Sequence, residues 1–262
     1  MEVIHSELLE CNDMSDFKNY KYLIVRESNF KLEIILNRPD KKNAINSEML
    51  EELMSCTDYA NENDSVRAVV YKSTGDVFCA GLDLYDFKEN NMTNALSDVF
   101  NLLHKPKLAV LEGDAYGGGV LLILCCNYVI SKSDVKLCLP EVDRGLFPFQ
   151  VMDALIKVMP AKKALDWCIR GLSVDAKDCL EMNVIDEINN NIEESVSDWI
   201  STITSKSPNA IASGLKSFEN IYVNKKIIGK LNDELQKLKE SDDFIEGIKS
   251  LREKRKPTWK KS

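Results

Sequence analysis

The chain has 262 residues, of which 44% are hydrophobic and 29% are charged, so it can bury a sizeable core and lacks the composition of a disordered protein. Its net charge of −8 argues against nucleic acid as the main partner, because phosphate binding needs a basic face. The apolar runs fall short of the roughly 20 residues that span a bilayer, and the acidic N-terminal stretch is unlike a signal peptide, so we expect a cytoplasmic protein without a membrane span.

The cysteines and histidines argue against disulfides and metal sites. The eight cysteines form no CxxC pair, and several lie inside apolar runs, which is typical of buried free thiols. Only two histidines are present, His5 and His104, and no potential ligands cluster along the chain. We therefore expect no metal site.

The N-terminal part of the chain predicts a hairpin followed by a helix. Short β-rich runs at residues 22–25 and 31–36 are separated by ESNF, which is typical of a turn. Asn46 or Ser47 can then cap a helix in which apolar side chains recur on one face from Leu50 onward. Such a helix is expected to pack on a sheet.

The middle of the chain contains the strongest strand signals. Residues 66–72 and 107–113 are near-continuous apolar runs, typical of a sheet covered on both faces, and a helix at 92–104 is predicted between them. Three glycines then lead into a short buried helix at about 118–126. Two further short strands are predicted at residues 128–131 and 136–139.

Most of the chain after Val151 is predicted to be helical. Amphipathic segments occur at residues 161–170, 192–204, 209–221 and 227–250. No low-complexity linker divides the chain. The sequence therefore predicts a core of ββα type followed by a helical C-terminal part.

Two glycine turns are candidate positions for binding an oxygen of a ligand. In FCAGLDL (78–84), Gly81 allows a tight turn that leaves the amide of Leu82 facing a cleft. The three glycines at 117–119 stand at the start of an apolar helix, where the missing Cβ atoms let a ligand approach amides that carry a positive partial charge. Two such amides aimed at one oxygen form an oxyanion hole.

A lone carboxylate follows in LPEVDRGLFPF (139–149), where Glu141 stands between apolar neighbours. Such surroundings destabilise the charged form and raise the pKa, which suits a general acid or base near neutral pH. Taken alone, each of the three stretches also has an ordinary structural explanation: close helix packing for the glycines, a turn for FCAG, and a helix or strand start for PE.

Taken in order, the three stretches resemble the crotonase superfamily, also called the enoyl-CoA hydratase/isomerase family. The resemblance begins with LNRPDKKNAIN, runs through VRAVVYKSTGDVFCAGLDL, GDAYGGG and PEVDRGLFP, and reaches EGIKSLREKRKPTW, so it covers nearly the whole chain after residue 20. It implies an α/β fold, a crotonase-like spiral of repeated ββα units with a C-terminal helical trimerisation region. We expect an N-terminal extension at 1–18, the spiral core with the acyl-CoA site at 19–195, and the helical region at 196–262.

The resemblance also implies a substrate class and roles for individual residues. Members of this family bind acyl-CoA thioesters and stabilise an enolate-like thioester oxygen, so coenzyme A is part of the substrate and no further cofactor is expected. Carried over by position, the two amide donors are those of Leu82 and Gly118, and Glu141 is the acid/base.

Further substrate contacts are expected at Ala80, Asp83, Gly117, Leu121, Phe147 and Phe149. The amides around Ala80, Leu82 and Asp83 are expected to meet the adenine end of coenzyme A. The two rings are expected to line the acyl pocket, although packing alone also explains them. Lys41 and Lys42 are candidates for the coenzyme A phosphates, or are simply solvated.

The chain departs from the hydratases at one position. They carry a glutamate two residues after the last glycine, where this chain has Leu121, whereas their second glutamate matches Glu141. Hydration is explained by two carboxylates that hold one water, but a single carboxylate can carry a proton from C2 to C4. The 3-enoyl-CoA isomerases resemble this chain at both positions, so we expect 3-enoyl-CoA to 2-enoyl-CoA isomerisation by a homotrimer or hexamer.

Three alternatives remain open. RGLFPF and EKRKPTW resemble bacterial proteins that are called enoyl-CoA hydratases, so hydration is the first alternative. A thioesterase or decarboxylase would reuse the oxyanion hole with a different acid or base. A non-catalytic homologue would bind acyl-CoA without turnover.

Overall fold

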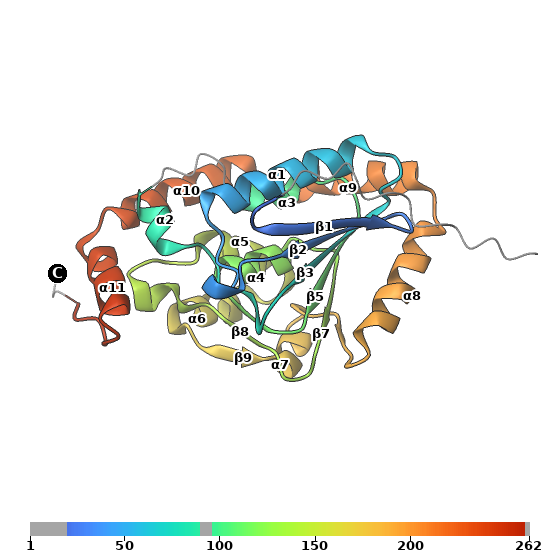
Figure 1. Ribbon diagram of the computed structural model, residues 1–262. Coiled ribbons are helices and arrows are strands. Elements are labelled where there is room, and N and C mark those ends of the chain that lie inside the picture. The colour runs from blue at the N-terminus through green and yellow to red at the C-terminus, as the bar shows by residue number, and fades with distance from the viewer. Residues whose placement is uncertain (1–19, 90–95, 260–262) are drawn as a thin grey trace, which may run out of the picture.

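Residues 20–89 and 96–259 are described by the structure, which is a computed structural model (Figure 1). The N-terminal extension expected at 1–18 lies outside the described residues, and so do positions 92–95 of the helix expected at 92–104. The described part of that helix is α3 (Leu96–Asn101), which ends three residues earlier than expected.

The larger sheet forms the middle of the molecule. Its strands in spatial order are β1 (Leu23–Ser28), β2 (Lys31–Leu36), β3 (Ala68–Ser73), β5 (Lys107–Leu111), β7 (Tyr128–Ser131) and β10 (Glu187–Ile188). β1 and β2 form the expected antiparallel hairpin, with Asn29 and Phe30 at positive φ in the turn. The later neighbours are all parallel, so the chain must cross over between them.

The strands of the smaller sheet alternate along the chain with those of the larger sheet from β3 to β8. Its members are β4 (Val77–Cys79), β6 (Asp114–Tyr116), β8 (Lys136–Cys138) and β9 (Ser173–Asp175). In each of the pairs β3–β4, β5–β6 and β7–β8, the first strand belongs to the larger sheet and the second to the smaller sheet. This alternation confirms the expected spiral of ββα units. β4, β6, β9 and β10 are two or three residues long and were not predicted, whereas β8, which has three residues, was. Strands this short show little periodicity.

Helices and short turns of 3-10 helix connect these strands. In chain order they are η1 (Pro39–Lys41), α1 (Ser47–Glu62), α2 (Leu84–Glu89), α4 (Gly118–Leu124), η2 (Pro140–Arg144), α5 (Phe149–Val158), α6 (Ala161–Arg170), α7 (Ala176–Glu181) and α8 (Ile192–Thr204). α1 is capped as expected, because the Asn46 side chain accepts a hydrogen bond from the Met49 amide.

Helix α8 lies on the side of the larger sheet away from α4 and α5, as Figure 1 shows. Ile192, Val196 and Ile200 pack there on Val70 and Val110, while the other face of the sheet belongs to the main core. The larger sheet is therefore covered on both faces, as its apolar strands predicted. The expected division between residues 195 and 196 falls inside α8.

The C-terminal helices are α9 (Pro208–Tyr222), α10 (Lys225–Lys239) and α11 (Asp242–Arg252). The prediction of one helix at 227–250 is wrong, because the chain divides at Ser241. Its side chain accepts a hydrogen bond from the Phe244 amide and caps α11, and two aspartates in the first turn complement the helix dipole. The break lets α11 pack against η2 rather than continue along α10.

The contact between α11 and η2 is unusually close for two backbones. Gly247 lies against the Arg144 carbonyl, and a Cβ atom at position 247 would overlap that oxygen. Gly145, at φ +69°, ends η2 and lies in similarly close contact with the start of α11. Phe244 buries its ring against Leu146 beside this contact. η2 is therefore held in place by the C-terminal helix.

The seven cysteines of the described residues are free thiols, as expected, and four of them are buried. Across the same residues, no helix is both long and apolar enough to cross a membrane. Nor does the described part of the chain contain a group of three or more His, Cys, Asp or Glu side chains placed to hold a metal ion.

Candidate active site

The three stretches singled out in the sequence follow three neighbouring strands. Gly81 and Leu82 come after β4, the glycine run comes at the end of β6, and Glu141 comes after β8. β4, β6 and β8 run parallel in this order. Their carboxyl ends therefore meet at one edge of the smaller sheet, which brings the three stretches together.

A cavity of about 1020 Å³ lies at this edge, and residues of α2, α5 and α10 complete its walls. Every residue assigned to the site from the sequence borders this cavity: Ala80, Leu82, Asp83, Gly117, Gly118, Leu121, Glu141, Phe147 and Phe149. Lys41 and Lys42 also border it and are exposed.

The two glycine turns lie directly against each other. Gly81 has φ +86°, and a Cβ atom there would lie 3.0 Å from the Gly118 nitrogen. A Cβ atom at Gly118 would in turn lie 3.4 Å from the Leu82 nitrogen. Among the backbone hydrogen bonds of the described loops, neither the Leu82 amide nor the Gly118 amide acts as a donor. Two free N–H groups thus lie close together at the cavity.

Gly117 explains why a glycine must precede this helix. It has φ +49°, and a Cβ atom at this position would lie 2.7 Å from the Oε1 atom of Glu141. Any other residue would therefore be strained and would push the carboxylate away from the start of α4. The glycine run lets the acid/base candidate and an amide donor share one small space.

Glu141 carries a carboxylate with one buried oxygen that has no hydrogen-bond partner in the described part of the chain. The residue lies in η2 directly after Pro140, and its Oε2 atom is buried without a hydrogen-bond partner among the described residues. Burial raises the pKa of Glu141 to about 7, because the charged form loses its hydration and gains no compensating charge. At neutral pH this group can therefore both accept and release a proton.

Apolar side chains surround this carboxylate. Leu121 lies one turn after Gly118 on α4 and is 3% exposed. The rings of Phe147, in the loop after η2, and Phe149, at the start of α5, lie with their centroids 5.2 Å apart on one wall of the cavity. This lining favours an alkyl chain as the neighbouring part of a ligand.

The amides of Ala80 and Asp83, which were expected near the adenine end of coenzyme A, donate hydrogen bonds within the protein. Ala80 donates its N–H to the Lys42 carbonyl at 2.9 Å, and Asp83 donates its N–H to the Ile45 carbonyl at 2.8 Å. These two bonds tie the segment around Leu82 to the loop that precedes α1. They leave the Leu82 amide between them as the one that is free.

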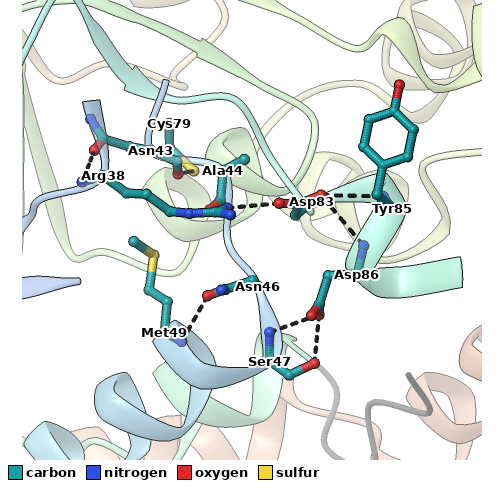
Figure 2. Close-up of polar contacts among 10 residues, drawn as sticks. All are labelled: Arg38, Asn43, Ala44, Asn46, Ser47, Met49, Cys79, Asp83, Tyr85 and Asp86. Atoms are coloured by element: carbon teal, nitrogen blue, oxygen red, sulfur yellow. Dashed lines mark hydrogen bonds and ion pairs between the residues drawn. The ribbon is translucent and has the colours of Figure 1, made fainter. Parts of the chain in front are cut away.

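An ion pair strengthens this connection (Figure 2). Arg38 donates through Nη1 to the Asp83 carboxylate at 2.7 Å and to the Ala44 carbonyl at 2.9 Å. Both charged side chains are mostly buried, with 13% and 14% exposed. Three residues further along, Asp86 accepts hydrogen bonds from the amide and hydroxyl of Ser47 at the start of α1. The loop that carries Leu82 is thus fixed at both ends.

Some residues of the site were not identified from the sequence. Arg38 lies within LNRPDKKNAIN, so its motif was available, but its partner Asp83 is too distant in the chain to be recognised. Gln150 and Asn232 border the cavity from α5 and α10 and are hydrogen-bonded to each other. No local pattern marks them, because their meeting depends on how α10 packs.

Comparison with known proteins shows the family of this chain. The family model "Enoyl-CoA hydratase/isomerase" matches residues 27–262. A "Probable enoyl-CoA hydratase" of Bacillus subtilis (strain 168) is 32% identical over 239 residues, which are 83% of this chain and 91% of the relative.

Solved structures show the same fold. A carnitinyl-CoA hydratase from Mycobacterium avium has a TM-score of 0.80 and 27% identity, and the match covers 91% of this chain and 98% of that one. An enoyl-CoA hydratase/isomerase from Pseudoalteromonas atlantica T6c has a TM-score of 0.82 over 92% of this chain and all of its own, and at 23% identity it shows the fold alone. This chain belongs to the crotonase superfamily and is an enzyme of the enoyl-CoA hydratase/isomerase family.

Proposed function

We propose that this enzyme converts 3-enoyl-CoA to 2-enoyl-CoA with Glu141 as its single acid/base. The observation that carries this proposal is the isolation of the Glu141 carboxylate. Of the other carboxylates that border the cavity in the described part of the chain, Asp83 is paired with Arg38, and Asp233 and Glu240 are exposed on α10 and just beyond it.

The proposed reaction moves one proton and needs no water. The thioester oxygen lies between the amides of Leu82 and Gly118, and Glu141 removes a proton from C2. The electrons move onto the thioester oxygen as an enolate, which the two amides stabilise. Glu141 then returns the proton to C4, and the double bond moves into conjugation with the thioester. One oxyanion-hole donor typically contributes about 10²–10³ in rate.

Hydration is the second candidate, favoured by the name of the Bacillus subtilis relative. It would require Glu141 to hold a water molecule together with a second polar group. The position that carries the additional glutamate in hydratases is Leu121 here, and that side chain is buried. The isomerase reaction needs no such group, which is why it is preferred.

The rest of the substrate and the assembly are also part of the proposal. Lys41 and Lys42 lie exposed at the cavity, where they suit the phosphates of coenzyme A. No cofactor other than the substrate's coenzyme A is required by this chemistry. We propose a cytoplasmic homotrimer or hexamer, and light scattering on the purified protein measures the oligomeric state.

The deciding experiment is product identification with each substrate supplied separately. Purified enzyme receives 3-enoyl-CoA or trans-2-enoyl-CoA, and mass spectrometry and absorbance identify the products. We expect conversion of 3-enoyl-CoA to the conjugated isomer and negligible addition of water. Formation of 3-hydroxyacyl-CoA from the 2-enoyl substrate at a comparable rate would instead establish hydration.

Substitution of the carboxylate tests its role. Glu141→Gln should lower the rate by at least about 10³-fold, because general acid/base catalysis is lost while size is kept. Asp143→Asn is the matched control: this exposed carboxylate lies in the same turn but does not border the cavity, so activity should be retained. Substantial activity in Glu141→Gln would exclude Glu141 as the single acid/base.

A further inference from the structure

A second cavity of about 320 Å³ adjoins the candidate active site. It lies among α4, α5, α9 and α10, and it shares two wall residues with the first cavity, Leu121 and Gln150. The two spaces are therefore neighbours separated by a wall to which two side chains contribute.

The wall is held in place by specific contacts. Gln150 donates through Nε2 to Asn232 on α10, and its Oε1 accepts a hydrogen bond from the Ser97 amide at the start of α3 at 3.3 Å. The side chain is thus held between two other helices. Leu121 is buried and belongs to the main core. Both wall residues are fixed by their surroundings.

The charged groups around the second cavity already have partners within the protein. Lys157 pairs with Asp153 at 2.7 Å, and His104 lies 3.5 Å from the Glu219 carboxylate. Lys107 donates to backbone carbonyls at the end of α3, including that of Phe100 at 2.6 Å. These groups therefore do not call for a charged ligand.

The remaining lining is largely apolar. It includes Leu124, Ala154, Val158, Leu215, Phe218 and Ile228. Such a surface suits hydrocarbon, because burial of each methylene group is favourable without any hydrogen bond. Of the parts of an acyl-CoA, only the distal end of a longer acyl chain has this character.

The direction of the substrate points to the same wall. Gly118 and Leu121 are three residues apart on α4 and therefore lie on one face of the helix. An acyl chain whose thioester oxygen meets the Gly118 amide, and whose C2 faces Glu141, continues toward Leu121. This step rests on the proposed function.

We propose that the second cavity is an extension of the acyl site behind this wall, and that Leu121 and Gln150 determine the length of acyl chain that the enzyme accepts. With both side chains in place, a chain ends at the wall and the enzyme favours short acyl groups. When either is shortened, the chain enters the second cavity. Each methylene that enters then strengthens binding by roughly fourfold.

The test measures binding of saturated acyl-CoAs from butanoyl-CoA to dodecanoyl-CoA by titration calorimetry. Saturated chains are not turned over by the proposed reaction, so the readout is independent of catalysis. In the native protein, affinity should stop rising once the chain reaches the wall. In Gln150→Ala and Leu121→Ala, affinity should continue to rise, by on the order of tenfold for two further methylene groups.

A plugging substitution is the matched control. Ala154 borders the second cavity and not the first, so Ala154→Leu added to Gln150→Ala should restore the native length profile. Unfolding curves identify any variant that does not fold. If Leu121→Ala does not fold, Gln150→Ala alone provides the test.

The possible failures are distinguishable. If acyl-CoAs bind but the length profile is the same in native and opened variants, the wall assignment is overturned while the proposed function stands. The wall assignment is also overturned if the double variant Gln150→Ala with Ala154→Leu still binds longer acyl chains as tightly as Gln150→Ala does. If no acyl-CoA of any length binds, the proposed function fails and this inference fails with it.

Discussion

At the scale of single residues, Glu141 owes its chemistry to burial rather than to a charged partner. Its carboxylate lies beside Gly117 and among apolar side chains, so the neutral form is favoured up to about pH 7. A glutamate with an ordinary pKa would be ionised at that pH but would be a weak base.

The pH dependence of the reaction follows from this pKa. As a base, Glu141 must be ionised in the free enzyme, so kcat/KM should fall about tenfold for each pH unit below about 7. A pH–rate profile with 3-enoyl-CoA measures the inflection. An inflection near the ordinary glutamate value would show that water reaches the carboxylate.

The same shift predicts an effect on stability. The folded state holds the Glu141 proton more tightly than the unfolded chain does, so ionisation destabilises the fold as pH rises from about 4.5 to about 7. Glu141→Gln removes this effect and should raise the free energy of unfolding by about 1–3 kcal/mol above pH 7. Urea titrations at several pH values should show the gain vanishing near pH 4. A gain that is independent of pH would point to packing instead.

At the scale of elements, the loop between β4 and α2 is positioned by contacts with the loop before α1. The buried pair Arg38–Asp83 flanks Leu82, whereas the Asp86–Ser47 contacts lie at the start of α2 and α1 (Figure 2). The first contact is adjacent to the free amide and the second is not.

Two isosteric substitutions separate these contacts. Asp83→Asn should lower kcat by about 10–100-fold, because the Leu82 amide loses its fixed position and a small displacement weakens an oxyanion contact. Asp86→Asn should mainly reduce stability, by about 0.5–2 kcal/mol, as loss of a helix-capping contact does. Steady-state kinetics and thermal unfolding of both variants provide the comparison. Equal losses of kcat would contradict a positioning role for Asp83.

At the scale of the whole molecule, the C-terminal helix α11 packs against the turn η2, which carries Glu141 of the candidate active site. α11 meets η2 at Gly247 and the Arg144 carbonyl, three residues from Glu141. Any movement of α11 away from this contact displaces the turn that carries the carboxylate.

Gly247→Ala tests this support. The added methyl group overlaps the Arg144 carbonyl, so α11 must shift, with an expected loss of about 1–3 kcal/mol in the free energy of unfolding and a lower kcat. Gly214→Ala in α9 is the control, because its Cβ would contact nothing within 4 Å. That substitution should stabilise the protein by about 1 kcal/mol. The expectation fails if both variants behave alike.

The features of the fold and of the site that the sequence predicts well lie in short contiguous stretches. Gly81 with Leu82, the glycine run, and Glu141 each stand in a local motif, and the apolar strands and capped α1 carry clear periodic signals. The break at Ser241 was missed because apolar periodicity continues across it, although its capping pattern was present. The contacts of α10 with the cavity, through Asn232, depend on packing between distant segments that no local pattern records.

The alternation of strands between two sheets has a consequence for how such an enzyme can change. Each candidate catalytic group stands at the end of its own strand, with the amides after β4 and β6 and the carboxylate after β8. Neighbouring strands keep a spacing of about 4.8 Å, so the hydrogen-bonded backbone of the sheet fixes the distances between the three groups. One loop can therefore be exchanged for another without redesign of the remaining two. In the proposed reaction, the amides that stabilise charge and the carboxylate that moves the proton belong to different loops, so the second can change while the first is retained.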